Sequence, residues 1–122
     1  SQVYRRIHSF CLTTTDGCLP EGQLILVADK KGPRFYGTTT TGGEGNSGTI
    51  FKLVPPNKSP DAGWKEKPVY NFCTQTGCDD GSNPSFVALL RHRGKFYGTT
   101  AFGGSDNVGV IFRFGWERQR DW

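Results

Sequence analysis

One stretch of this chain occurs twice, and the spacing of its two copies limits the possible folds more than any other feature. Residues 34–39 (Arg-Phe-Tyr-Gly-Thr-Thr) return at 95–100 (Lys-Phe-Tyr-Gly-Thr-Thr), and residues 48–53 (Gly-Thr-Ile-Phe-Lys-Leu) return at 109–114 (Gly-Val-Ile-Phe-Arg-Phe). A Gly-Gly pair lies between the two stretches in both copies, and the offset is 61 residues throughout. Twice 61 is the chain length of 122 residues, so two units of one architecture are predicted.

Each unit contains about four short strand candidates, separated by a large share of the 17 glycines and seven prolines. The candidates are 24–28, 34–40, 49–54 and 67–72 in the first unit, and 86–90, 95–101, 110–114 and 117–122 in the second. The run Val3 to Phe10 precedes the first cysteine pair as Lys67 to Phe72 precedes the second, so we expect a strand there too. The resulting prediction is one domain over 1–122, with an N-terminal strand at 1–10, repeat one at about 11–72 and repeat two at about 73–122.

Apolar residues lie on both faces of the predicted strands. In 49–53, Phe51 and Leu53 share one face while Ile50 lies on the other, and 110–114 has the same pattern. A sheet with one solvent-exposed face would alternate more regularly between apolar and polar residues. The fold class predicted is therefore all-β, with two propeller-blade-like, four-stranded antiparallel repeats. A two-sheet sandwich with pseudo-twofold symmetry is the alternative.

The motifs Tyr36-Gly37-Thr38-Thr39, Gly42-Gly43 and Gly48-Thr49-Ile50-Phe51-Lys52-Leu53 resemble the bacterial tandem repeats called GloVer. The short cysteine loop followed by Asp80-Gly81 and Pro84 also resembles some copies of that repeat. The resemblance implies an exported or surface-anchored protein with a propeller-like fold. It implies no catalytic residues.

Two blades are too few for a closed propeller, which needs roughly four to eight. We therefore expect the chain to complete its sheets by oligomerisation or strand exchange, with the N-terminal strand of one copy entering the last sheet of another. Head-to-tail contacts of this kind close into a ring or continue as a fibre. The alternative is that the chain is a fragment of a longer repeat array.

Four cysteines form two close pairs, Cys11 with Cys18 and Cys73 with Cys78. Two local disulfides are predicted, which favours an extracellular or cell-surface location. A four-thiolate zinc site is the alternative, but neither pair has the usual two-residue spacing. No run of about 18 apolar residues predicts a membrane span, and we expect the chain as given to be a mature form without a signal peptide.

The net charge of +4 comes from Lys and Arg residues spread along the chain. The nearest approach to a cluster is Arg91-His92-Arg93, which suits an acidic polysaccharide or an anionic cell surface better than nucleic acid in a disulfide-bearing protein. Trp64 and Trp116 each follow a glycine and are candidates for stacking on a sugar, although packing between sheets would equally explain them. Asp79 and Asp80 lie in an oxygen-rich loop that plain turn chemistry explains better than calcium binding.

No catalytic constellation is recognisable. The two histidines, His8 and His92, occupy different positions in the two units, and the acidic residues are scattered. We therefore expect no enzyme activity, no cofactor and no metal. The expected function is a secreted, self-assembling, lectin-like protein that binds surface carbohydrate. The alternative is a structural subunit of an extracellular fibre or coat without a small ligand.

Overall fold

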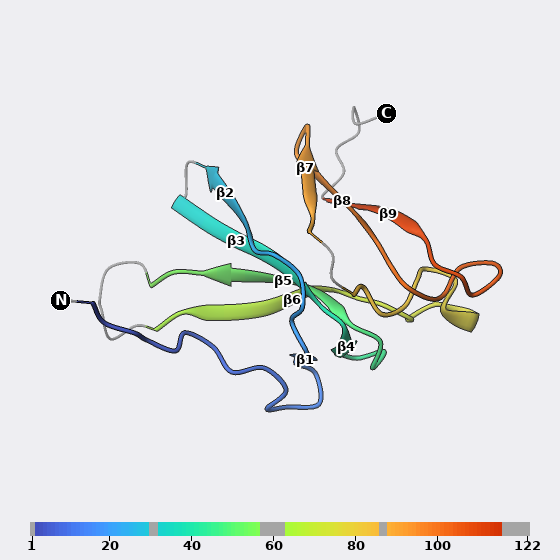
Figure 1. Cartoon of the computed structure of the whole chain (residues 1–122), viewed down its shortest axis with the longest axis horizontal. Helices are drawn as coiled ribbons and strands as arrows, with labels where there is room; N and C mark the ends of the chain where they lie inside the picture. The colour runs from blue at the N-terminus through green and yellow to red at the C-terminus, as the bar shows by residue number, and fades with distance from the viewer. Residues whose placement is uncertain (1, 30–31, 57–62, 86–87, 116–122) are drawn as a thin grey trace.

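The computed structural model describes residues 2–29, 32–56, 63–85 and 88–115, and it is an all-β fold built from antiparallel sheets (Figure 1). A four-stranded sheet, called sheet one here, has the order β2-β3-β5-β6, and a three-stranded sheet, sheet two, has the order β7-β8-β9. β1 and β4 form a separate two-stranded pair. The strands are β1 (Gly17–Cys18), β2 (Ile25–Asp29), β3 (Gly32–Thr39), β4 (Thr41–Gly42), β5 (Thr49–Val54), β6 (Lys65–Asn71), β7 (Leu90–His92), β8 (Lys95–Thr99) and β9 (Ile111–Phe114).

Most of the predicted strands are present with small shifts of their ends. β5 has the predicted bounds, and β3, β6, β8 and β9 differ from the prediction by one or two residues at either end. Of the strand predicted at 86–90, residues 86 and 87 lie outside the described residues. The described strand β7 covers Leu90–His92 and ends there because Arg93 and Gly94 both have positive φ and form a tight two-residue turn into β8. The strand predicted at 117–122 lies outside the described residues.

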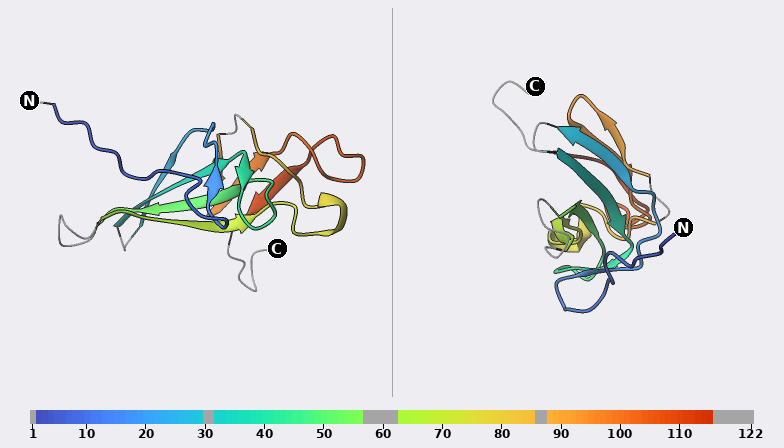
Figure 2. Two further views of the ribbon diagram at one scale, coloured as in Figure 1. Left: turned by 90° about the horizontal axis from the view of Figure 1, so that it is seen from below. Right: turned by 90° about the vertical axis from the view of Figure 1, so that its left-hand side faces the viewer.

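The N-terminal strand predicted at Val3 to Phe10 is wrong. Residues 2–10, called the arm here, run along sheet one without forming a strand. A strand exists only where its backbone pairs with a neighbour, and no described strand lies beside the arm in register. In Figures 1 and 2 the arm lies on one side of sheet one and sheet two on the other.

The main core lies between the two sheets. Its buried members include Tyr36 and Ile50 from sheet one, Phe96 from sheet two, and Phe72 and Leu89 from the connections. The rings of Tyr36 and Phe96 lie 4.5 Å apart, and those of Phe72 and Phe112 lie 5.2 Å apart. These aromatic pairs, each at a favourable contact distance, hold the sheets face to face.

The glycine of the repeated Phe-Tyr-Gly-Thr-Thr motif has a packing role. Gly37 lies opposite Phe51 in the sheet register, and a Cβ there would approach the Phe51 ring to 2.8 Å. Gly98 lies opposite Phe112 in the same way, where a Cβ would come within 2.5 Å of the ring. Each aromatic ring therefore occupies the space above a glycine, which explains why the two residue types recur together.

Both predicted disulfides are confirmed. Cys11 bonds to Cys18, and Cys73 bonds to Cys78. The first disulfide begins at the residue after Phe10, and the second at the residue after Phe72. Each closes a small loop between that residue and the next element of the chain. In the described part of the chain, no helix is long and apolar enough to cross a membrane.

Candidate functional site

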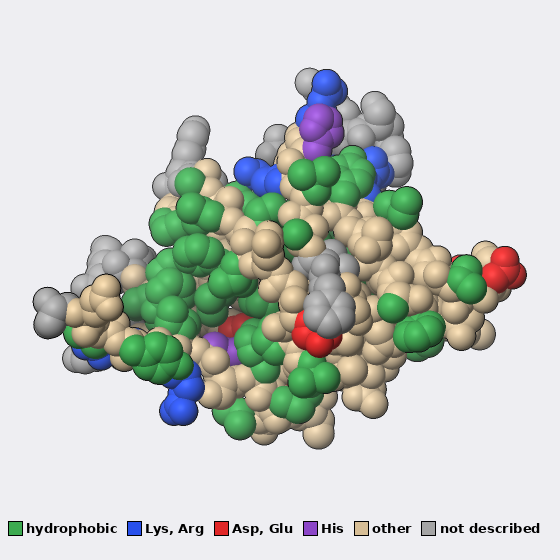
Figure 3. Space-filling model, viewed as in Figure 1, with side chains coloured by type: hydrophobic (Ala, Val, Ile, Leu, Met, Phe, Trp, Pro, Cys, Tyr) green, Lys and Arg blue, Asp and Glu red, His purple; other side chains and the backbone are tan. Residues whose placement is uncertain are grey.

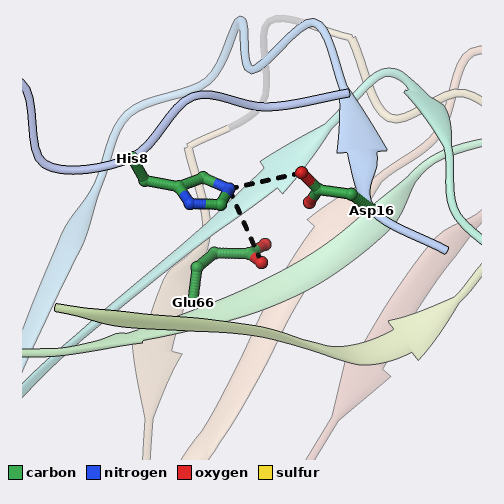
Figure 4. Close-up of side chains that lie close together, drawn as sticks. All are labelled: His8, Asp16 and Glu66. Carbon is green, nitrogen blue, oxygen red and sulfur yellow. Dashed lines mark ion pairs between the residues drawn. The ribbon is translucent and has the colours of Figure 1, made fainter. Parts of the chain in front are cut away.

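Three side chains that are distant in sequence meet where the arm crosses sheet one (Figure 4). His8 comes from the arm, Asp16 from the first disulfide loop and Glu66 from β6. The His8 Nε2 atom lies 3.3 Å from Asp16 Oδ2 and 3.7 Å from Glu66 Oε1. One ligand atom from each of the three lies within 4.8 Å of the others.

Local structure fixes each of the two carboxylates. The backbone N–H of Cys11 donates to Asp16 Oδ2 at 3.0 Å, and the backbone N–H of Asp16 donates to Thr13 Oγ1 at 3.2 Å. The loop closed by the Cys11–Cys18 disulfide thus holds Asp16 in one orientation. Glu66 lies opposite Leu53 in the β5–β6 register, so it projects from the same face of sheet one as that leucine, toward the arm.

The site is largely buried, and part of its hydrogen-bonding capacity is not used within the described residues. The side chains of Glu66 and Asp16 are only 4% and 10% exposed. His8 Nε2, Asp16 Oδ1 and Glu66 Oε2 are shielded from solvent and make no hydrogen bond within the described residues. Burial, together with the charge of Asp16, raises the pKa of Glu66 to about 7. Such unsatisfied buried polar atoms are costly and call for a specific explanation.

This cluster is hard to predict from the sequence. His8 is one of two histidines, and nothing in the sequence links it to Asp16 or Glu66, because the three residues belong to different segments. The available signal was a mismatch between the two units. Tyr70 stands 62 residues after His8, the same offset that relates Cys11 to Cys73, so the histidine replaces a tyrosine at this position.

Tyr70 and Asp80 form a simpler arrangement beside the second disulfide loop. Tyr70 Oη donates to Asp80 Oδ2 at 2.6 Å, and the backbone N–H of Gln75 donates to Asp80 Oδ1 at 3.4 Å. Burial raises the pKa of Asp80, but these hydrogen bonds outweigh it and leave the value below the ordinary 3.8. Burial, with a smaller contribution from Asp80, raises the pKa of Tyr70 to about 12. Here the carboxylate is satisfied by its own neighbours.

Replacing Tyr70 with phenylalanine is expected to lower the free energy of unfolding by about 1 kcal/mol at pH 7, because a charge-assisted hydrogen bond at a partly exposed site is lost. The lowered pKa of Asp80 makes this contribution present above pH 3.8 and lost as the pH falls below it. The raised pKa of Tyr70 makes the stabilising contribution of this hydrogen bond present below pH 10 and lost between pH 10 and about 12. Urea unfolding at pH 7 and pH 3 measures the effect.

The matched control for this substitution is Tyr97→Phe, since the Tyr97 hydroxyl makes no hydrogen bond within the described chain. We expect Tyr97→Phe to unfold like the wild type at both pH values. Equal stability of Tyr70→Phe and wild type at pH 7 would contradict a stabilising Tyr70–Asp80 bond.

The sequence-predicted site residues that the structure describes lie on different elements. Trp64 is half-buried against Phe35, with ring centroids 5.9 Å apart, while Trp116 lies outside the described residues. Arg91 and His92 are exposed on the β7–β8 hairpin. Asp79 is exposed after the short 3-10 helix η1 (Thr76–Cys78), and Asp80 is held by Tyr70.

A pocket of about 380 Å³ opens beside the His8 cluster. Its floor is the apolar face of sheet one, with Phe51 and Leu53, and its wall is the arm, including Tyr4, Arg5 and Arg6. Phe10 closes one end, with its ring 5.1 Å from that of Phe51. The pocket therefore exists because the arm lies on the sheet.

Comparison with models of protein families, with curated proteins and with solved structures gives no match to this chain.

Proposed function

We propose that this chain is a non-catalytic assembly module of an extracellular repeat protein, which completes its sheets by stacking on and pairing with further copies of itself. One comparison carries the proposal. Ile50 in sheet one is 1% exposed because sheet two covers it, whereas Ile111, which stands 61 residues later in sheet two, is 82% exposed. The same apolar position is thus covered in one sheet and bare in the other.

The strand registers support this comparison. Tyr36 pairs with Lys52 between β3 and β5, and Tyr97 pairs with Arg113 between β8 and β9, so both partners shift by 61 residues. Because side chains alternate across a strand, Ile50 and Ile111 project from corresponding faces of their sheets. If a further sheet packed on sheet two in the way that sheet two packs on sheet one, it would bury Ile111.

The opposite end of the molecule offers the complementary surface. Leu24 and Leu26 are exposed on or beside β2, and Ile7 of the arm is exposed near them. Figure 3 shows hydrophobic side chains gathered over this side of the molecule. Exposed apolar patches on both outer sheet faces mark surfaces that associate.

The arm supplies the edge pairing. It packs on sheet one through the Phe10–Phe51 contact at 5.1 Å, and the segment that ends β6 packs on sheet two through Phe72–Phe112 at 5.2 Å. β6 pairs with β5, but the arm has no paired neighbour and β9 pairs only with β8 within the described residues. The arm of one copy therefore fits beside β9 of the next, with His8 opposite Ile111 by analogy with Tyr70 opposite Ile50.

Such a contact is head-to-tail, since the arm and β9 are different surfaces. It closes into a ring when the rotation between copies fits, and otherwise it continues as a fibre. Two, three or four chains would give rings of four, six or eight sheets, within the range of known propellers. This arrangement agrees with the resemblance to GloVer-type repeats.

Ile111→Asp tests the proposal, because it places a charge on the face that the next copy would cover. We expect association between copies to weaken by at least about 100-fold, as for a residue at the centre of an interface. Val108→Asp is the matched control, since Val108 is comparably exposed but lies in a loop outside the sheet face. Sedimentation equilibrium measures both. Equal association of the two variants would contradict the stacking of copies through sheet two.

Carbohydrate binding stays a prediction with less support from the geometry. Trp64 is half-buried against Phe35, with ring centroids 5.9 Å apart, and Trp116 lies outside the described residues. A glycan array with the wild type and Trp64→Ala tests the hypothesis, and an absence of binding to neutral and acidic glycans would contradict it.

A further inference from the structure

We propose that His8, Asp16 and Glu66 bind a divalent transition-metal ion of the zinc class, which fastens the arm to sheet one. The inference goes beyond the proposed assembly function and does not depend on it. It rests on the geometry of the three ligand atoms, on two buried carboxylates that each have one oxygen without a hydrogen-bond partner within the described residues, and on the different arrangement around Tyr70.

The separations of the ligand atoms match a metal site. Zinc binds imidazole nitrogen and carboxylate oxygen at about 2.0–2.2 Å, so two ligands in a tetrahedral shell lie about 3.3–3.6 Å apart. The His8 Nε2 atom lies 3.3 Å from Asp16 Oδ2 and 3.7 Å from Glu66 Oε1. All three ligand atoms lie within 4.8 Å of one another, as ligands around one ion must.

Burial supplies the second and independent observation. The Glu66 side chain is only 4% exposed. Its Oε2 atom faces the cluster but has no hydrogen-bond partner within the described residues. Asp16 Oδ1 is likewise buried without a hydrogen-bond partner within the described residues. Two carboxylate side chains therefore lie beside one imidazole in a largely buried cluster, where a charge without a partner is very costly. A divalent cation would balance this charge and use the unpartnered atoms.

The arrangement around Tyr70 shows what the same local structure does without a histidine. There Asp80 accepts from the Tyr70 hydroxyl at 2.6 Å and is satisfied. At the first loop, a histidine stands in place of the tyrosine and a buried glutamate adds a third ligand. The Cys11 N–H that donates to Asp16 Oδ2 provides the outer-shell hydrogen bond that usually orients a carboxylate ligand.

The ligand types indicate the class of ion. Imidazole with two carboxylates suits zinc and neighbouring transition ions, whereas calcium and magnesium prefer oxygen ligands alone. Three protein ligands leave a further position open to the adjoining pocket, where water would complete the shell. Because the ligands come from the arm, the disulfide loop and β6, the ion would add a further link between these three segments.

Titration of the metal-free chain with Zn²⁺, in competition with a chromophoric chelator, tests the proposal, and Co²⁺ gives a direct visible-absorption readout of the ligand shell. We expect one ion per chain. His8→Gln and Glu66→Gln should each weaken binding by at least about 100-fold, since loss of an outer-shell partner alone costs about 10–100-fold. His92→Gln is the matched control and should bind like the wild type, because His92 is exposed on the β7–β8 hairpin.

A second measurement needs no variant. The imidazole ¹⁵N resonances of His8 in the wild-type chain should shift on addition of one equivalent of Zn²⁺, while those of His92 stay unchanged. Absence of Zn²⁺ and Co²⁺ binding by the wild type would overturn the proposal. So would binding that His92→Gln abolishes, or binding that both His8→Gln and Glu66→Gln retain.

Discussion

Replacing Phe72 with alanine is expected to lower the free energy of unfolding by about 3–5 kcal/mol, the usual cost of deleting a buried phenylalanine ring. Phe72 is among the most deeply buried side chains of the described chain and belongs to the core between the sheets. Its ring contacts Tyr70 at 5.1 Å on one side and Phe112 of sheet two at 5.2 Å on the other. The lost ring would leave a cavity at the junction of the two sheets.

Urea unfolding measures this loss as a lower midpoint with an unchanged slope. Phe102→Ala is the matched control, because Phe102 is exposed in a loop, and we expect an effect within about 0.5 kcal/mol. If Phe72→Ala were no more destabilising than Phe102→Ala, Phe72 would not be part of a core shared by the two sheets.

Replacing Thr39 with valine is expected to cost about 2–4 kcal/mol, although the two side chains have nearly the same shape. Thr39 and Thr49 are both 0% exposed, and their hydroxyls lie 2.8 Å apart in a hydrogen bond. Thr39 Oγ1 also accepts from the backbone N–H of Thr49 at 3.0 Å. Valine would leave both groups of Thr49 buried and unpaired, at about 1–3 kcal/mol for each.

Thr39→Ser is the control that keeps the hydroxyl, and we expect it to restore most of the stability. Urea unfolding compares the three chains directly. A valine variant as stable as the serine variant would show that the hydroxyl contributes nothing beyond filling space, and would contradict this account of the second threonine in the Phe-Tyr-Gly-Thr-Thr motif.

The sequence was most informative where local chemistry determines structure. β5 could be predicted with its bounds because Thr49 to Val54 is a short, β-branched and aromatic run that follows a glycine. The two disulfides could be predicted because each cysteine pair is only a few residues apart in the chain. These features depend on neighbours in sequence, which the pattern of residues records directly.

Features that depend on distant partners could not be predicted. Val3 to Phe10 has a strand-like composition, but a strand needs a paired neighbour, and the described chain offers none to the arm. The His8 cluster was missed because the bulge and register of β6 bring Glu66 to the arm face, and no local pattern encodes that register. For Trp64 both sugar stacking and packing are compatible with the sequence, and its contact with Phe35 of β3 depends on sheet pairing that no local pattern records.

Within the described residues, sheet two has a bare face and the arm has no paired strand, and a second copy would complete both. Light scattering of the purified, disulfide-intact chain measures the molar mass of the species in solution. We expect a mass of at least twice that of the 13.5 kDa chain, in a whole-number multiple, or a filament. A stable 13.5 kDa species at every concentration examined would contradict the proposal that copies of this chain complete one another's sheets.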